Sequence, residues 1–201
     1  RTVITFIGDP EQVIKAAYKL IERASYLIDM SHHKGEHPRM GATDVCPFIP
    51  IRNVSMKECI KYSNELAILV GNELKIPVYM YEYSATTSSR KNLSYIRLGE
   101  YEGFEEKIKS NDWIPDYGPS IFNKKSGSTA IGAREFLIAY NINLNTDDKK
   151  IATDIALDIR ESGRAKRDKN NTIIRDDKGK IIKVPGKLKN CKAVGWYIDE
   201  Y

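Results

Sequence analysis

The hydrophobic pattern at the start of the chain predicts a strand and then a helix. Residues 1–8, RTVITFIG, are rich in apolar and β-branched residues, which favours an extended strand. Asp9 supplies a helix-capping oxygen and Pro10 suits the first helical position, and apolar residues then recur at helical spacing to Ala24. Residues 31–44 lose this periodicity and are polar, so we expect a loop there.

The next segments repeat the alternation of strand and helix. Residues 43–51 form an apolar run that predicts a strand, and the two prolines within it confine this strand to an edge or irregular position. Ser55 and Glu58 have the spacing of a capping box, which predicts a second helix to about Lys75. Residues 77–81 then predict another strand.

The second half of the chain shows weaker patterns. Residues 84–130 contain short, weak helical patterns and a loop rich in Gly, Ser and Pro. Residues 136–144, FLIAYNINL, predict a buried strand, and a helix is expected from about Thr146. Two β-rich runs around a tight turn predict a hairpin over 172–184, and residues 193–198 predict a last strand.

Strands that alternate with helices in this way predict an α+β or α/β sandwich, in which helices cover one face of each sheet. The pattern restarts after the Gly- and Ser-containing loop. We therefore expect a subdomain boundary near Ile131–Arg134, with one subdomain over residues 1–133 and a second over 134–201.

Composition narrows the class of protein. Hydrophobic residues make up 41% of the 201 residues and charged residues 29%, values typical of a soluble globular chain. No apolar run approaches the ~20 residues of a membrane-spanning helix, and neither end has the pattern of a secretory signal. Cys46, Cys59 and Cys191 are odd in number and form no C-x-x-C pair, which indicates reduced thiols in a cytosolic compartment.

Positive charge is concentrated near the end of the chain. Residues 160–192 contain twelve Lys or Arg and four Asp or Glu, a local charge of +8 within a chain of net charge +5. This density raises nucleic acid as a partner, but the segment has no aromatic residue on which bases could stack. A solvated basic face and the attraction of a small polyanion both remain open.

All the histidines lie in one short segment, SHHKGEHPRMG at 31–41. His32, His33 and His37 could be metal ligands, but the H-E-x-x-H spacing is absent and Gly and Pro interrupt any helix. A histidine near its reference pKa also suits general acid–base catalysis at neutral pH. The third interpretation, surface histidines without a chemical role, stays open from the residues alone.

The loop GPSIFNKKSGST at 118–129 is the second candidate site. Its small residues expose backbone N–H groups that can hold a carboxylate or the polar edge of a heterocycle. It lacks the G-K-[ST] ending of a phosphate-binding Walker loop. A flexible surface linker is the alternative interpretation.

Six stretches of the chain resemble one family. They are RTVITFIG (1–8), LIDMSHHKGEHPRMGATDVCPFIP (27–50), IPVYMYEY (76–83), WIPDYGPS (113–120), GAREFLIAYNINL (132–144) and VGWYIDEY (194–201). They are similar to the formiminotransferase domain of glutamate formiminotransferase, including the transferase half of the bifunctional formiminotransferase–cyclodeaminase. The resemblance covers nearly the whole chain, and its longest uninterrupted block is highly specific.

The resemblance implies an activity and a fold. The activity is transfer of the formimino group between N-formimino-L-glutamate and tetrahydrofolate, in histidine degradation. The implied fold has two ferredoxin-like α/β sandwiches with a ligand tunnel between them. A cytoplasmic homodimer is also implied, with no metal, no nucleic acid and no membrane as partner.

The family's catalytic histidine falls on His37, as general acid and base. Its folate-binding loop falls on Gly118, Pro119, Ser120, Ile121, Phe122, Asn123, Lys124, Lys125, Ser126 and Gly127. From their closeness to His37 in sequence, we add Arg39 and Lys34 as expected contacts of the substrate carboxylates. Because both substrates are anionic, the basic 160–192 segment is expected to raise the local concentration of folate, including polyglutamylated folate.

The sequence also departs from the family pattern. The first strand and helix of the first subdomain, and the closing part of the second, are expected to lie outside this sequence. Residues 168–187 look like an insertion, and Ser126 stands where the family has a tryptophan. A formyltransferase acting on N-formylglutamate and a non-catalytic folate-binding relative therefore remain alternatives.

Overall fold

The computed structural model describes residues 2–35 and 37–198. It forms two compact units, residues 1–138 and 139–201, and each is described by itself below. No helix in the described part of the chain is long and apolar enough to cross a membrane.

A three-stranded parallel sheet forms the centre of the first unit. Its strands are β1 (Val45–Phe48), β2 (Val78–Glu82) and β3 (Thr129–Ala133), in the order β1-β3-β2. The register pairs Val45 with Ala130 and Val78 with Thr129. Because β3 lies between the other two strands, every one of its residues is buried.

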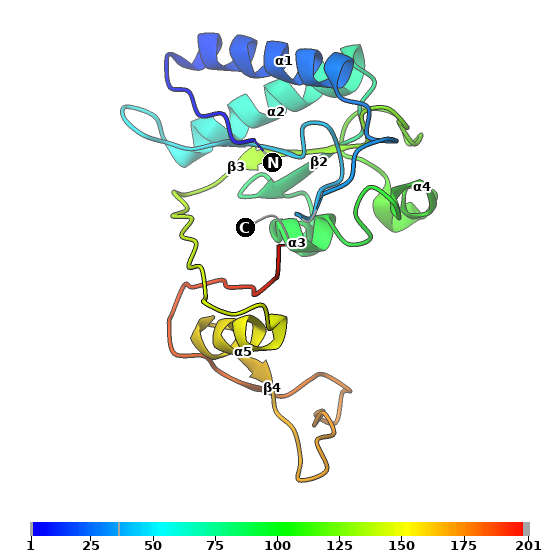
Figure 1. The fold of residues 1–201 in the computed structure, drawn as a ribbon. Coiled ribbons are helices and arrows are strands. Elements are labelled where there is room, and N and C mark those ends of the chain that lie inside the picture. The colour runs from blue at the N-terminus through cyan, green and yellow to red at the C-terminus, as the bar shows by residue number, and fades with distance from the viewer. Residues whose placement is uncertain (1, 36, 199–201) are drawn as a thin grey trace. The chain divides into compact units, whose positions relative to one another are not determined.

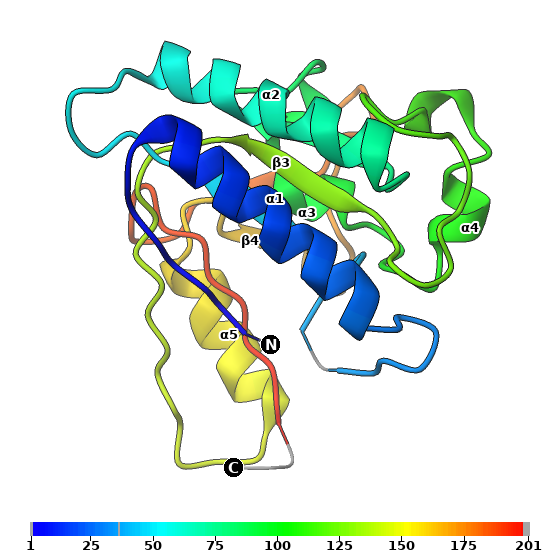
Figure 2. The same ribbon diagram turned by 90° about the horizontal axis from the view of Figure 1, so that it is seen from above.

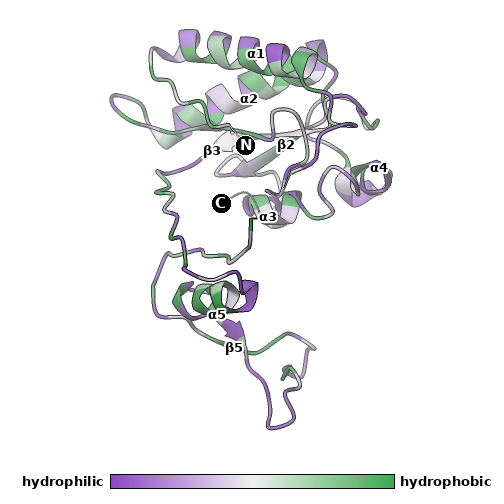
Figure 3. Cartoon of the chain, viewed as in Figure 1, coloured by the Kyte–Doolittle hydropathy of each residue, from purple (hydrophilic) through white to green (hydrophobic). Residues whose placement is uncertain are grey.

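Two long helices cover one face of this sheet, as Figures 1 and 2 show. They are α1 (Pro10–Leu27), capped by Asp9, and α2 (Met56–Glu73), whose capping box joins Ser55 and Glu58. Figure 3 shows polar and apolar residues alternating along α1, as expected for a helix with one buried side. The core beneath these helices contains Ile14, Ala17, Ile21, Phe48, Cys59, Leu66, Ala67, Val70, Ile76, Val78, Met80, Ile131 and Ala133.

Short helices lie on the opposite face. They are η1 (Ser89–Lys91), α3 (Leu93–Ile96), α4 (Phe104–Lys107) and η2 (Asn111–Trp113). Figure 1 places α3 and α4 on the other side of the sheet from α1 and α2. A second apolar core forms there from Met40, Tyr79, Tyr81, Ile96, Phe104, Ile108 and Ala130.

A buried ion pair joins this second layer to the sheet. The Arg90 guanidinium donates to the Asp116 carboxylate at 2.9 Å, and both side chains are only 8% exposed. Asp116 also accepts from the backbone N–H of Met80 at 2.7 Å and from the Thr86 hydroxyl at 2.5 Å. Since every one of these groups is paired, the segment that leads into residue 118 is fixed to β2.

The described residues of the second unit, 139–198, form one helix and a hairpin. Helix α5 (Lys149–Ile159) is capped by Asp148, and β4 (Arg164–Ala165) pairs antiparallel with β5 (Lys183–Val184). Between them, Arg175 forms a bridge to Ile181 around a tight turn, which confirms the predicted hairpin. Its lysine side chains lie in exposed positions.

Three predicted strands are wrong within the described residues. Residues 2–8 run as an exposed irregular segment (Arg1 lies outside the described residues), and residues 193–198 form no strand. The stretch 136–144, predicted to be buried, is exposed, with Ile138 92% accessible. A β-rich pattern becomes a strand only where a neighbour accepts and donates its hydrogen bonds, and no described segment pairs with these three.

The structure also contains a strand that the pattern missed. Residues 129–133, TAIGA, were expected within a loop and at the subdomain boundary, yet they form the central strand β3. The two long helices, β1, β2 and α5 are confirmed, with β1 at the sheet edge as its prolines required. The α+β class is confirmed, whereas the ferredoxin-like topology, the tunnel and the division at residues 133/134 stay predictions.

We expect Asp116→Ala to lower the free energy of unfolding by about 3–5 kcal/mol, because it leaves the Arg90 guanidinium buried without its counter-charge. Asp112→Ala is the matched control, since Asp112 is exposed and reaches Arg90 through its backbone carbonyl. That change should stay within about 0.5 kcal/mol. Urea unfolding measures both, and equal losses would show that the ion pair is not the stabilising contact.

Candidate functional site

The two candidate segments of the sequence lie side by side. The backbone N–H of Met30 donates to the carbonyl of Lys125 at 2.8 Å, and Ala42 N–H donates to Ser126 O at 2.9 Å. Ser128 N–H donates to Met40 O, also at 2.9 Å. The structure therefore joins the histidine loop (residues 30–44) to the loop at 118–128 by backbone hydrogen bonds.

Glycines at the junction allow this close approach. A Cβ atom on Gly127 would lie 2.2 Å from the carbonyl oxygen of Met40, and one on Gly41 would lie 2.0 Å from that of Ser128. Gly127 also has a φ of +66°, a left-handed conformation that favours glycine. Any side chain at these two positions would push the loops apart.

The other end of the 118–128 loop is fixed in a similar way. Gly118 has a φ of +83°, and a Cβ there would lie 2.5 Å from Ile76 O. Just before it, Val78 N–H donates to Tyr117 O at 2.9 Å. Within the loop, Asn123 accepts from Gly127 N–H through its backbone carbonyl, at 2.7 Å. The loop thus has two anchored ends.

Tyr101 connects the two loops from a third segment. Its backbone N–H donates to Arg39 O at 2.9 Å, and its hydroxyl donates to Lys124 O at 2.5 Å. Its ring packs against that of Phe122, with centroids 5.5 Å apart. Sequence reasoning missed Tyr101, because it lies among the weak helical patterns of 84–130 and carries no motif of its own.

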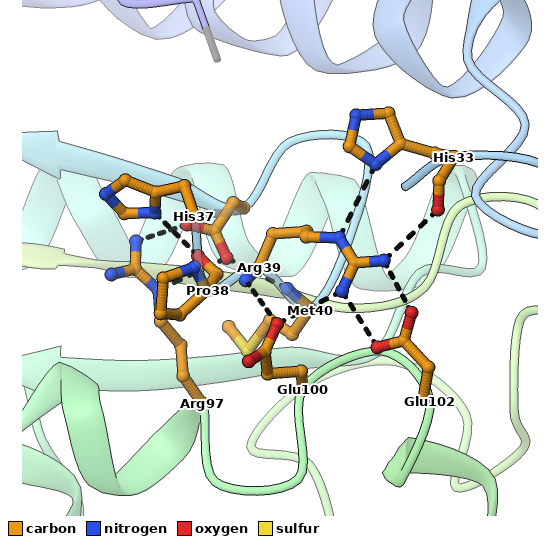
Figure 4. A network of polar contacts seen from close by, with 9 residues as sticks. His33, His37, Pro38, Arg39, Met40, Arg97, Glu100 and Glu102 are labelled. Atoms are coloured by element: carbon orange, nitrogen blue, oxygen red, sulfur yellow. Dashed lines mark hydrogen bonds and ion pairs between the residues drawn. The ribbon is translucent and has the colours of Figure 1, made fainter. Parts of the chain in front are cut away.

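Arg39 lies at the centre of a polar network (Figure 4). Its guanidinium donates to both carboxylate oxygens of Glu102, at 2.8 and 2.5 Å, and to Glu100 at 3.1 Å. It also donates to the backbone carbonyl of His33 at 3.1 Å and to the Nδ1 of His33 at 3.4 Å. These five hydrogen bonds equal the number of N–H groups in a guanidinium.

The network changes the ionisation of its members. The hydrogen bond from Arg39 lowers the pKa of Glu102, and the same bond raises the pKa of Arg39. A carboxylate with a lowered pKa contributes its stabilisation above its ordinary pKa and loses it as the pH falls through the lowered value. The Arg39–Glu102 pair is therefore charged at neutral pH.

His37 is half-buried on the histidine loop, and its Nδ1 lies 2.9 Å from the carbonyl oxygen of Pro38. A carbonyl can only accept, so Nδ1 carries the proton in this contact. The neutral ring then has its basic lone pair on Nε2. Figure 4 shows His37 and Arg39 extending from the same short segment.

The other two histidines have different surroundings. His32 is exposed, with its Nδ1 3.6 Å from the Asp29 carboxylate, whereas the Nδ1 of His33 accepts from Arg39. Within residues 2–35 and 37–198, no three His, Cys, Asp or Glu side chains group as metal ligands would. The structure thus brings His33 into contact with Arg39 and leaves His32 beside Asp29. The expected absence of a metal stays a prediction.

Lys34 and Cys46, on either side of Arg39 in the sequence, have different surroundings. Lys34 is exposed and lines a surface depression of about 430 Å³ together with Gly35, Arg39, Gly99, Glu100 and Glu102. Cys46, which follows the histidine loop in β1, is half-buried, and desolvation raises the pKa of its thiol to about 12. That thiol is protonated at neutral pH and is no nucleophile.

The fold and the site together define an α+β domain with two joined loops, one carrying the three histidines and the other rich in Gly, Ser and Lys. The model of the formiminotransferase domain's N-terminal subdomain matches residues 1–134, and the model of the formiminotransferase domain matches residues 139–201. The chain belongs to the formiminotransferase domain family, which confirms the resemblance seen in its sequence.

Curated relatives agree with this family. The formimidoyltransferase-cyclodeaminase of Mus musculus is 49% identical over 200 residues, which cover 100% of this chain and 34% of that protein. The glutamate formimidoyltransferase of Streptococcus pyogenes serotype M1 is 42% identical over 200 residues, 100% of this chain and 60% of that protein. The glutamate formimidoyltransferase of Thermoplasma acidophilum is 46% identical over 162 residues, 80% of this chain and 53% of that protein. The chain thus spans a third to three fifths of the length of these relatives.

We expect Gly127→Ala to lower the free energy of unfolding of the first unit by clearly more than about 1–2 kcal/mol. An alanine in the left-handed conformation alone costs about that much. The new methyl group would in addition collide with Met40 O. Gly99→Ala is the control, since Gly99 has a φ of +82° but its Cβ would meet only the backbone of Gly103, at ordinary distances of 3.6 and 3.9 Å. Thermal unfolding compares the two variants, and equal destabilisation would contradict a close approach of the loops.

Proposed function

We propose that this chain carries part of the active site of a glutamate formimidoyltransferase, which transfers the formimino group between N-formimino-L-glutamate and tetrahydrofolate in histidine degradation. Membership of the family supports the reaction class. The observation that carries the proposal is the backbone pairing of the histidine loop with the 118–128 loop. This pairing supports the proposal because it joins the loop that carries His37 to the loop proposed to bind the folate.

His37 is the proposed general acid and base. The folate N5 attacks the amidine carbon of formiminoglutamate, and a tetrahedral intermediate forms. The Nε2 of His37 accepts the proton from N5 and returns it to the glutamate nitrogen, so that the bond from carbon to this nitrogen breaks and glutamate leaves. Proton transfer of this kind contributes about 10²–10⁴-fold, and holding the two substrates together contributes further. No step needs a metal or a covalent enzyme intermediate.

The 118–127 loop is the proposed folate-binding segment, and tetrahydrofolate is a substrate rather than a resident cofactor. Exposed Lys34 is the proposed contact of a substrate carboxylate. Arg39 would have to release a Glu or a His33 contact to serve in the same way, since all five of its N–H groups have partners within the chain. A cytoplasmic homodimer with a substrate tunnel between subdomains completes the proposal.

We expect His37→Ala in the full-length protein to lower kcat by about 10²–10⁴-fold with little change in KM, because the proton would have no carrier. His32→Ala is the control, since His32 is exposed and contacts Asp29, and it should retain activity within about two-fold. Single-turnover assays with tetrahydrofolate measure the transfer.

The same assay separates the proposed function from its rivals when N-formylglutamate replaces N-formimino-L-glutamate. Faster transfer from the formyl donor would identify a formyltransferase. Tight folinate binding without turnover of either donor would identify a binding protein. An undiminished kcat in His37→Ala would overturn the mechanism.

The basic segment is proposed to attract anionic folates. We expect the double change Lys178→Glu/Lys180→Glu on the exposed hairpin to raise the KM for polyglutamyl folate several-fold at low salt, because the local potential reverses there. Lys15→Glu/Lys57→Glu on α1 and α2 changes the net charge equally and should have a smaller effect. KM values for mono- and polyglutamyl folate at two salt concentrations measure this, and an equal salt dependence for both folates would contradict it.

A further inference from the structure

The two residues that follow Pro38 are held by hydrogen bonds of their main chain. The backbone N–H of Arg39 donates to the Glu100 carboxylate at 3.4 Å, and its carbonyl accepts from Tyr101 N–H at 2.9 Å. Met40 N–H then donates to the Asp44 carboxylate at 3.0 Å. Two consecutive residues are therefore held by main-chain hydrogen bonds, two positions from the proposed proton carrier.

The side chain of Arg39 adds a second hold on the same loop. It reaches back to the carbonyl and the ring of His33 and forward to Glu100 and Glu102, as Figure 4 shows. Residues on both sides of His37 are thus connected through one guanidinium. The Arg39 side chain is 12% exposed, whereas those of Glu100 and Glu102 are 40% and 61% exposed, so solvent still screens the carboxylates of these pairs.

The turn that supplies the carboxylates has an unusual backbone. Gly99 has a φ of +82° and Glu100 a φ of +53°, so a non-glycine residue occupies the left-handed region. Such a conformation persists only where its surroundings hold it. Here the Glu100 carboxylate accepts from both the backbone and the side chain of Arg39.

These contacts decide between two roles for Arg39. A substrate carboxylate would have to displace Glu102, which already binds the guanidinium with both of its oxygens. Holding the loop requires no such exchange. We infer that Arg39 and Glu102 form a clasp that positions His37 for proton transfer, a role that rests on the function proposed above.

In the full-length protein, Glu102→Gln should lower kcat by about 10- to 100-fold, because a displacement of about 1 Å at a reacting group costs that much. The KM for N-formimino-L-glutamate should stay within about two-fold. Arg39→Lys should behave alike, since an ammonium keeps the charge but cannot span His33, Glu100 and Glu102 together. Glu102→Asp should recover part of kcat. Glu105→Gln, an exposed neighbour on α4, is the control and should leave kcat unchanged.

Amide hydrogen exchange supplies a readout independent of activity. Exchange of the peptide that covers residues 30–42 should accelerate in Glu102→Gln and not in Glu105→Gln. Unchanged exchange, or faster exchange with an unchanged kcat, would overturn the inference. A ten-fold higher KM with an unchanged kcat in Arg39→Lys would make Arg39 a substrate ligand instead. A wild-type protein that transfers nothing would overturn the proposed function, while exchange would still decide whether Glu102 holds the loop.

Discussion

The parallel pairing of β1 with β3 is the constraint on which the site depends. Val45 lies opposite Ala130 in this pairing, and the histidine loop enters β1 just as the 118–128 loop enters β3. Because parallel strands begin at the same edge of a sheet, both loops arrive there together. The site therefore lies at the amino ends of the strands, whereas ligands of open α/β sheets usually bind at the carboxyl ends.

Local sequence signals predicted the helices well. The strands were predicted less well, because a strand depends on partners that are distant in the sequence. The caps at Asp9 and Ser55 lie within a few residues of the groups they bind, so the sequence alone contains them. Strand β3 is short and made of small residues, and it is a strand because two neighbours enclose it. Residues 136–144 have the stronger β pattern but no partner among the described residues. Partners, more than propensity, decide which segments form the sheet.

The candidate site shows the same difference between local signals and contacts that are distant in the sequence. His37 and the 118–127 loop could be proposed from the sequence because their residues form continuous stretches with recognisable chemistry, and their roles stay predictions. Glu100, Tyr101 and Glu102 were not, since their contacts with Arg39 span about sixty positions and an acidic turn between glycines resembles any solvated surface turn. Only the folded chain shows that this turn holds the histidine loop.

The glycine contacts at both ends of the 118–128 loop have a consequence for its evolution. Gly118 packs against the main chain before β2, and Gly127 against that of the histidine loop, so any change of length in this loop has to be absorbed between these two junctions. Exchange of exposed side chains between the two ends, such as Ile121, leaves both junctions intact. The hairpin of the second unit has more room for insertions, since Gly179 there has no atom within 4 Å of an added Cβ.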